Sequence, residues 1–190
     1  MRTITDIFSD RTCYKFQDKP VEVSLLKEIY DMMKLGPTSA NCCPLRIIFV
    51  SSIEGKKRLE KCLMAGNVAK TATAPVTALF AYDQKFYEQM DKTHPVSLDM
   101  KNYFASSEAI AIDTATRNST LQAAYFMMIA RGYGLDCGPM SGFNGDMIEK
   151  EFLSGTNFKI NFICNLGYKD GSDPYPKLPR LDFTEVCSIA

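Results

Sequence analysis

Residues 106–131 carry the longest helical pattern in the chain. A helix over these 26 residues would be about 39 Å long. Its second half has no polar face, because residues 121–130 are apolar apart from Gln122. A helix on the surface of a globular protein normally keeps one polar face, so a helix that is apolar all round has to be buried. The chain must therefore fold around this helix, either within one domain or between two copies of the chain.

The composition is that of a single globular domain. The chain has 190 residues, 46% of them hydrophobic, and neither repeats nor linkers divide it, so we expect one domain over residues 1–190. The 22 basic and 22 acidic side chains cancel, which argues against nucleic acid or a membrane surface as a partner. The N-terminus lacks the apolar run of a signal peptide, and the longest apolar run, residues 123–130, is too short to cross a bilayer. We therefore expect a cytoplasmic protein.

Hydrophobic periodicity predicts an α+β fold with few strands. Helical patterns cover residues 24–35, 53–64, 84–90, 106–131 and 145–153, and strand patterns cover residues 46–51, 75–82 and 159–168. A glycine-spaced run at residues 132–138 follows a helix rather than a strand, and its third glycine is one place late for a dinucleotide-binding fingerprint. We interpret this run as a helix C-cap followed by a turn.

Cysteine and histidine offer little material for a metal or nucleophile site. The seven cysteines are an odd number without a C-x-x-C pair, so we expect reduced thiols. His94 is the only histidine, which argues against a mixed Cys and His metal site and against a Cys–His pair. The glycosylation sequon at Asn118 lies inside a helical pattern and is best explained by chance. Residues 187–190 fit a prenylation box, but their upstream flank is acidic rather than basic.

A polar loop, residues 36–44, separates the first helical pattern from the first strand pattern. Prolines fix φ at both ends, and the short side chains between them can form hydrogen bonds. A plain proline-bracketed turn is the alternative interpretation. The pattern Pro-(Ser/Thr)-x-x-Asn-x-x-Pro resembles the flavin-contacting loop of the nitroreductase superfamily of FMN oxidoreductases. The resemblance implies FMN contacts from Pro37, Thr38, Ser39 and Asn41.

Basic residues near both ends of the chain extend this resemblance. Arg11 and Lys15 are two cations four residues apart that flank a small hydroxyl residue, as in the family's N-terminal phosphate motif, and such cations can hold a compact dianion by charge-assisted hydrogen bonds. An ordinary exposed basic pair is the alternative. Lys177 and Arg180 resemble the family's terminal basic pair. The resemblance implies that six residues bind the FMN phosphate: Arg11, Thr12, Cys13, Lys15, Lys177 and Arg180.

Two further motifs resemble the part of the family site that contacts the flavin ring. Asn67 and Lys70 match its Asn-x-x-Lys, and on a helix this spacing places both side chains on one face. There the amide could contact the pyrimidine edge and the ammonium the N1/O2 side, whereas the alternative is a solvated helix end. Residues 138–143 resemble the segment that directs a backbone N–H at flavin N5, although many relatives have Glu in place of Ser141. The resemblance implies ring contacts from Met140, Ser141 and Gly142, with the Gly142 backbone at N5.

These matches run in family order and imply a nitroreductase-like fold, with a small mixed or antiparallel sheet flanked by helices and a long buried central helix. They also imply a homodimer that holds two FMN molecules at its interface, with residues 37–41 serving the partner's flavin. NADH or NADPH would supply a hydride to the flavin, and an aldehyde, nitro compound or quinone would take it up. The alternatives are a flavin-binding protein without NAD(P)H-driven activity, such as a dehalogenase, a flavin-cleaving enzyme or a sensor, and a plain structural dimer.

Four segments of the sequence resemble one branch of this family. Residues 33–42, 70–78, 117–125 and 178–181 are similar to malonic semialdehyde reductases and their relatives, which implies a semialdehyde such as malonic semialdehyde as one candidate acceptor. Arg117, on the long helical pattern, is a candidate contact for an anionic substrate. An interhelical ion pair is the alternative role for this side chain.

Overall fold

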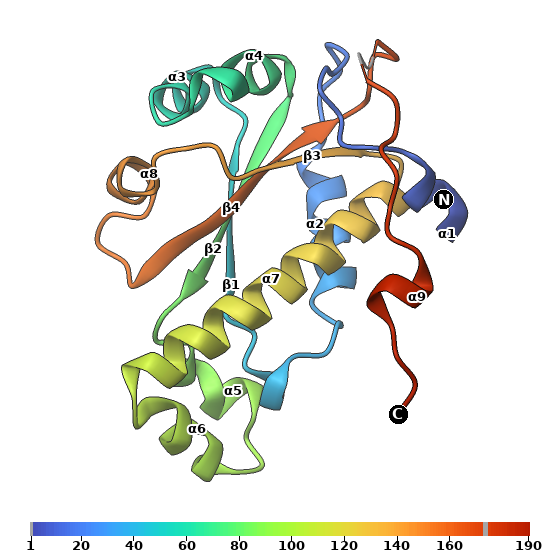
Figure 1. The fold of residues 1–190 in the computed structure, drawn as a ribbon. Coiled ribbons are helices and arrows are strands. Elements are labelled where there is room, and N and C mark those ends of the chain that lie inside the picture. The colour runs from blue at the N-terminus through green and yellow to red at the C-terminus, as the bar shows by residue number, and fades with distance from the viewer. Residues whose placement is uncertain (1, 173–174) are drawn as a thin grey trace.

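A computed structural model describes residues 2–172 and 175–190 of the chain (Figure 1). Within them the strands are β1 (Leu45–Val50), β2 (Val76–Asp83), β3 (Asp136–Met140) and β4 (Phe158–Gly167). The α-helices are α1 (Ile4–Ser9), α2 (Val23–Met33), α3 (Ile53–Glu60), α4 (Ala65–Thr73), α5 (Met90–Thr93), α6 (Leu98–Ala105), α7 (Glu108–Gly132), α8 (Gly145–Phe152) and α9 (Phe183–Val186). Two short 3₁₀ helices are η1 (Ser39–Asn41) and η2 (Phe86–Gln89).

The strands form one antiparallel sheet in the order β1-β2-β4-β3. Phe80 of the central strand β2 lies opposite Ile47 of β1 and Phe162 of β4. At the other edge, Gly138 of β3 lies opposite Asn165 of β4. The predicted α+β class is confirmed, and the sheet is antiparallel rather than mixed.

Alternate residues of β2 supply two cores, because successive side chains of a strand point to opposite faces of the sheet. Ala78 and Phe80 pack with side chains of α2 and α7, whereas Leu79 packs with side chains of α3 and α8. All three β2 side chains are fully buried. The sheet is therefore covered by helices on both faces (Figure 1).

Helix α7 is the long helix that the sequence predicts at residues 106–131. Phe126 packs edge-on against Phe80 of the sheet, with 5.5 Å between the ring centroids, and Ala123 is fully buried beside it. The opposite side is less covered, because Leu121 remains 40% exposed. One face of the apolar stretch is thus buried within the chain. Neither α7 nor any other helix in the described residues has an apolar stretch long enough to cross a membrane.

The helix expected at residues 53–64 is confirmed at its start but ends four residues early. Helix α3 ends at Glu60, after which Leu63 forms a β-bridge with Phe143 and Met64 N donates to Gly142 O (3.1 Å). This extended step separates α3 from α4, which the periodicity did not resolve as a helix of its own.

The helix expected at residues 84–90 is also wrong. The chain forms the 3₁₀ helix η2 and then the single-turn helix α5. The carboxylate of Asp83 accepts the backbone N–H of Lys85 (2.9 Å), which is a turn contact that competes with a regular helical start.

Strand β3 was not expected, because Gly138 and Pro139 both disfavour strands. Proline is tolerated here since β3 lies at the edge of the sheet, where one side of the strand has no partner strand.

The predicted end of the long helix is confirmed: Gly134 follows α7 with a left-handed φ of 95°. The turn beyond it is also confirmed, at Tyr133 and Gly134, but the chain then extends into β3 from Asp136, within the run that was expected to be a turn. Helices α1, α6 and α9 also lie outside the predicted patterns.

Candidate functional site

The segment after α1 lies along β3 at the edge of the sheet. Cys13 N donates to Cys137 O (2.9 Å), and Phe16 forms a β-bridge with Lys169. Cys13 is 2% exposed, so its side chain faces the protein interior. The N-terminal motif is therefore presented from a fixed backbone.

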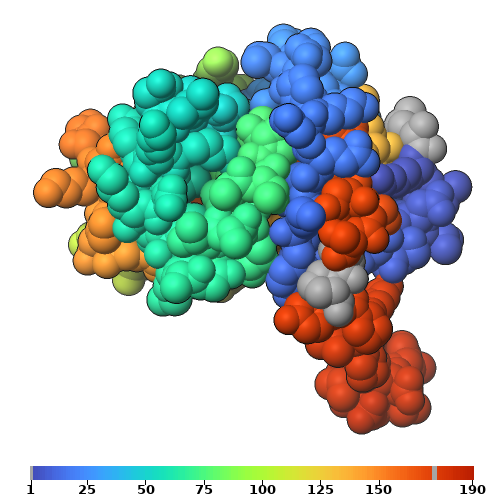
Figure 2. Space-filling view, turned by 90° about the horizontal axis from the view of Figure 1, so that it is seen from above, coloured from blue at the N-terminus to red at the C-terminus, as the bar shows by residue number. Residues whose placement is uncertain are grey.

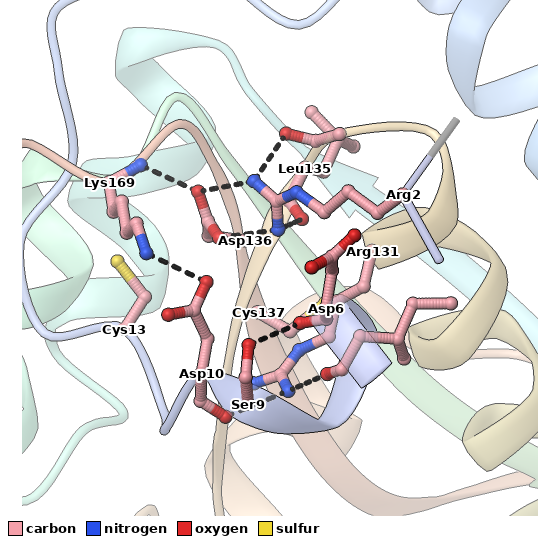
Figure 3. Close-up of polar contacts among 12 residues, drawn as sticks. Arg2, Asp6, Ser9, Asp10, Cys13, Arg131, Leu135, Asp136, Cys137 and Lys169 are labelled. Atoms are coloured by element: carbon pink, nitrogen blue, oxygen red, sulfur yellow. Dashed lines mark hydrogen bonds and ion pairs between the residues drawn. The ribbon is translucent and has the colours of Figure 1, made fainter. Parts of the chain in front are cut away.

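Arg131, in the last turn of α7, holds this segment from the inside (Figure 3). Its guanidinium donates to the backbone oxygens of Ile7 (2.7 Å), Asp10 (3.2 Å) and Arg11 (3.0 Å). A planar guanidinium can satisfy several carbonyls at once, which an ammonium does less well. Arg131 was not predicted as a functional residue, although a cation in the last turn of a long helix is a recognisable local signal.

Two ion pairs brace the same region (Figure 3). Lys169 Nζ lies 2.7 Å from Asp10 Oδ2, and this contact lowers the pKa of Asp10. Arg2 NH1 lies 2.9 Å from Asp136 Oδ1, and this hydrogen bond raises the pKa of Arg2. The pairs connect the N-terminal segment to the start of β3 and to the chain just after β4.

A cavity of about 540 Å³ opens beside this segment. Four cations and one carboxylate contribute to its lining, which consists of Phe8, Asp10, Arg11, Thr12, Arg131, Lys177, Leu178 and Arg180. The structure thus brings together four residues of the predicted phosphate set: Arg11, Thr12, Lys177 and Arg180. We call this space the cation cavity. Lys15 lies outside it and forms an ion pair with Asp170 (3.2 Å).

Arg11 is incompletely satisfied within this cavity. Its guanidinium lies over the rings of Tyr14 and Tyr175, 5.0 and 5.4 Å from their centroids, and NH1 donates to Pro176 O (3.2 Å). Its buried Nε has no acceptor in the described part of the chain. A buried donor left in this state costs about 1–3 kcal/mol. An anion in the cavity would offer the missing acceptor.

The basic pair near the C-terminus also faces backbone oxygens. Lys177 Nζ donates to Phe8 O, and Arg180 NH1 donates to Leu178 O (2.9 Å) and Pro179 O (3.0 Å). Neither cation forms an ion pair among the described residues. Both therefore keep their charge uncompensated at the mouth of the cation cavity.

A second group forms where α4 meets the end of β3. Asn67 Nδ2 donates to Gly142 O (2.8 Å), and a Cβ on Gly142 would lie 2.5 Å from that same nitrogen. Any other residue at position 142 would displace the Asn67 amide, so glycine preserves this contact. Asn67 and Lys70 lie on one helix, as their spacing predicts. Met140 is buried at the end of β3, and Ser141 is exposed beside it.

Tyr14 connects the two groups. The ammonium of Lys70 lies over its ring, 4.7 Å from the centroid, while Arg11 approaches the same ring at 5.0 Å. The Tyr14 ring thus links Arg11 of the cation cavity to Lys70, which lies three residues from Asn67 on α4. Tyr14 and Tyr175 were not recognised from the sequence, because nothing in their neighbours indicates a cation partner.

The loop of residues 37–41 lies elsewhere in the chain. Ser39 N donates to Asn118 Oδ1 (2.9 Å), and Tyr125 OH donates to Pro37 O (3.2 Å). Asn118 and Arg131 are 13 residues apart on α7, which corresponds to about 20 Å along the helix. Within one chain, the structure does not bring this loop to the cation cavity.

The same loop has a strained backbone. Ala40, Asn41 and Cys43 have φ of 46°, 52° and 42°, a region that residues other than glycine adopt at a cost of about 1–3 kcal/mol. Thr38 Oγ1 accepts the N–H of Cys43 (3.3 Å), and Asn41 Nδ2 donates to Thr93 O (2.6 Å). These contacts hold the conformation. Cys42 packs in the core, and burial raises its pKa to about 12, so its thiolate is not populated near neutral pH.

Arg117 forms an ion pair, but not between helices. Its NH2 lies 2.8 Å from Asp113 Oδ2, one turn earlier on α7, and both side chains are mostly exposed. The expected interhelical pair is therefore wrong. Such exposed pairs contribute little to stability.

Comparison with known proteins agrees with this geometry. Residues 7–168 match the sequence pattern of the Nitroreductase family. The ydfN protein of Bacillus subtilis, assigned as a nitroreductase, superposes with a TM-score of 0.88 at 20% identity over 98% of each chain. A protein from Exiguobacterium sibiricum assigned as a nitroreductase and solved in complex with FMN gives 0.87 at 18% identity, covering 100% of this chain and 98% of that one. A protein from Staphylococcus epidermidis assigned as an NAD(P)H:FMN oxidoreductase gives 0.84 at 18% identity, covering 100% and 97%.

Arg131→Met should loosen the N-terminal segment without unfolding the protein. Each charge-assisted hydrogen bond is worth about 1.5–3 kcal/mol, so loss of even one should speed amide exchange in residues 2–13 by roughly tenfold. Hydrogen-exchange mass spectrometry measures this directly. Arg117→Met is the matched control, since it makes the same change on the same helix at an exposed site. Similar exchange in both variants would contradict the role of Arg131.

Proposed function

The chain belongs to the nitroreductase family, and on this premise we propose that it is an FMN-dependent NAD(P)H oxidoreductase that passes a hydride to a small electrophile. The observation that carries the proposal is the cation cavity, in which Arg11, Lys177 and Arg180 meet, adjoining the Asn67–Gly142 contact. The first group suits a phosphate and the second suits an amide-bearing ring edge.

The cation cavity fits the phosphate of FMN. The buried Nε of Arg11 lacks an acceptor within the described residues, and a phosphate oxygen would supply one. The hydroxyl of Thr12 and the cations of Lys177 and Arg180 would complete the binding. The side chain of Cys13 is buried, so Cys13 would support the phosphate-binding segment from behind. Lys15 would reach the phosphate only after its ion pair with Asp170 breaks.

The second group fits the flavin ring. When bound, FMN supplies hydride transfer through its N5 position. The backbone N–H of Gly142 would lie at that position, with Met140 and Ser141 beside it. Asn67 would contact the pyrimidine edge, and the ammonium of Lys70 would stabilise negative charge on the N1/O2 side.

We further propose a homodimer in which Pro37, Thr38, Ser39 and Asn41 of one chain complete the FMN site of the other. The loop lies far from its own chain's cation cavity, so it can reach a flavin only in a second copy. Residues 175–190 support the same view, because every one of them is exposed and the segment projects from the body (Figure 2). Uncovered apolar side chains follow along it: Leu178, Leu181, Phe183, Val186 and Ile189. Such an apolar surface usually marks an interface.

The electron acceptor is proposed by class. A semialdehyde such as malonic semialdehyde follows from the resemblance to that branch of the family, and nitro compounds and quinones are the other candidates. Arg117 is the proposed contact for an anionic acceptor. Its guanidinium is exposed, and its ion pair with Asp113 is exposed as well, so an anion can reach it. NADH or NADPH is the proposed reductant, and the cytoplasm the proposed location.

The purified protein should be yellow, with one FMN per chain, and should bleach when NADPH or NADH is added under anaerobic conditions. Adding a semialdehyde, a quinone or a nitroaromatic should then restore the flavin absorbance with turnover. A yellow protein that neither nucleotide bleaches would contradict the reductase and favour a dehalogenase, a flavin-cleaving enzyme or a sensor. A colourless protein that takes up no FMN would indicate a structural dimer.

Arg11→Ala should weaken FMN binding about ten- to hundredfold, because one charge-assisted contact is worth about 1.5–3 kcal/mol. Riboflavin lacks the phosphate and should bind both proteins alike. Lys27→Ala is the control, since Lys27 is an exposed lysine on α2 that pairs with Asp31. Fluorescence titration gives both affinities. Equal losses for FMN and riboflavin would mean that Arg11 holds the fold rather than the phosphate.

The holoprotein should have the mass of a dimer, and FMN should dissociate as dilution separates the subunits. The reason is that residues 37–41 would be withdrawn from each site when the partner leaves. Light scattering over a dilution series, read together with flavin fluorescence, follows both quantities. A monomer that keeps stoichiometric FMN would refute the shared site.

A further inference from the structure

A second cavity, of about 420 Å³, lies between α3, α4 and the chain that follows Phe16. Lys56 of α3 reaches into the wall of this cavity, and Thr71 of α4 lies in the same wall. None of the residues assigned above to FMN lines it. We call this space the Lys56 cavity.

The amine of Lys56 is held by a buried polar network. Its Nζ donates to Thr77 Oγ1 (2.7 Å) and to Thr71 O (3.4 Å). The Thr77 hydroxyl donates in turn to Asn165 Oδ1 (2.7 Å), so it can only accept from the amine. Asn165 Nδ2 donates to Thr71 Oγ1 (3.2 Å), which closes the network. Thr77 and Asn165 are fully buried.

This network provides acceptors for a neutral amine rather than for an ammonium. A neutral amine has two N–H groups and a lone pair, and the two acceptors, Thr77 Oγ1 and Thr71 O, match those two donors. Among residues 2–172 and 175–190, no third acceptor and no carboxylate lies within contact of Nζ. Burial without a counter-charge disfavours the charged form, and it lowers the pKa of Lys56 to about 8.

The other charged groups around the cavity do not cancel this effect. Asp18, Lys57 and Glu60 also line it, but neither of the two carboxylates forms an ion pair with Lys56, and burial remains the cause of its lowered pKa. Lys70, on α4, lies over Tyr14 instead. The strands β2 and β4 face the amine with neutral side chains, those of Thr77 and Asn165.

We propose that Lys56 is a nucleophilic amine that captures small aldehydes entering this cavity as imines. The lone pair of Nζ forms a bond to the carbonyl carbon, and the carbonyl oxygen leaves as water with the two amine hydrogens, so that C=N replaces C=O. No oxidant or reductant is consumed, and hydrolysis reverses the step. The cavity has room for an aldehyde of a few carbon atoms, and its open side admits water for the release. This site is independent of the proposed flavin chemistry.

The experiment uses the purified protein with propionaldehyde and sodium cyanoborohydride, in the absence of NADH and NADPH. Cyanoborohydride reduces the imine to a stable secondary amine, and peptide mass spectrometry then measures modification at every lysine. Lys57 is the internal control, since it is the next residue on the same helix and is exposed. Both lysines are measured in the same protein sample. The ratio of their modification rates therefore does not depend on the reagent concentration or on whether a variant folds.

At pH 7.5 Lys56 should be modified roughly tenfold faster than Lys57, since a lowered pKa raises the fraction of neutral amine. The ratio should fall towards one as the pH approaches about 10, where ordinary lysines also lose their proton. Lys56→Met should abolish the fast modification and leave the slower sites unchanged. A ratio near or below one at pH 7.5 would overturn the proposal and would leave Lys56 as an anchor of α3 on the sheet.

Discussion

The packing of α7 on the sheet is the constraint on which the rest of the structure depends. Phe126 fills the space against Phe80, and burying a side chain of this size contributes about 1.5–3 kcal/mol. Near the middle of the helix, Asn118 accepts the backbone N–H of Ser39 and holds the polar loop. At its C-terminal end, Arg131 binds three carbonyls of the N-terminal segment. One rigid helix thus sets the separation between the two segments proposed to contact FMN.

The cation cavity lowers the stability of the folded chain, because like charges gather in it. Arg11, Lys177 and Arg180 gather with only one carboxylate of the described residues in the lining, that of Asp10, which already pairs with Lys169. The buried Nε of Arg11 adds a desolvation cost. A ligand that binds only the folded state raises the free energy of unfolding. An anion bound in the cation cavity would therefore stabilise the folded protein. The strained loop at residues 40–43 is a second cost of the same kind.

The parts of the site that could be predicted are those encoded by neighbours in the chain. The spacing of Asn67 and Lys70 places both on one helix, and α4 bears this out. The expected approach of flavin N5 to Gly142 stays a prediction, whereas the close contact of Asn67 with Gly142 was not expected. Sequence reasoning failed where a distant partner decides the outcome. The pairing of Lys15 with Asp170 is one such contact, since nothing near Lys15 in the sequence indicates this partner. Strand β3 contains Gly138 and Pro139, which only the edge of a sheet accommodates.

The sequence by itself determined that a long apolar helix had to be covered, that a polar loop precedes the first strand, and which residues carry the charges. Only the tertiary structure decided which of these segments meet. The contact between Arg131 and Arg11 O joins residues 120 positions apart, and that between Arg11 and Pro176 O joins residues 165 apart. Local propensity acts over a few residues, whereas these contacts arise when the antiparallel order β1-β2-β4-β3 brings the chain ends to one side of the sheet. The cation cavity therefore exists only in the folded chain, because its residues are far apart in the sequence and come together only when the long helix α7 is packed on the sheet.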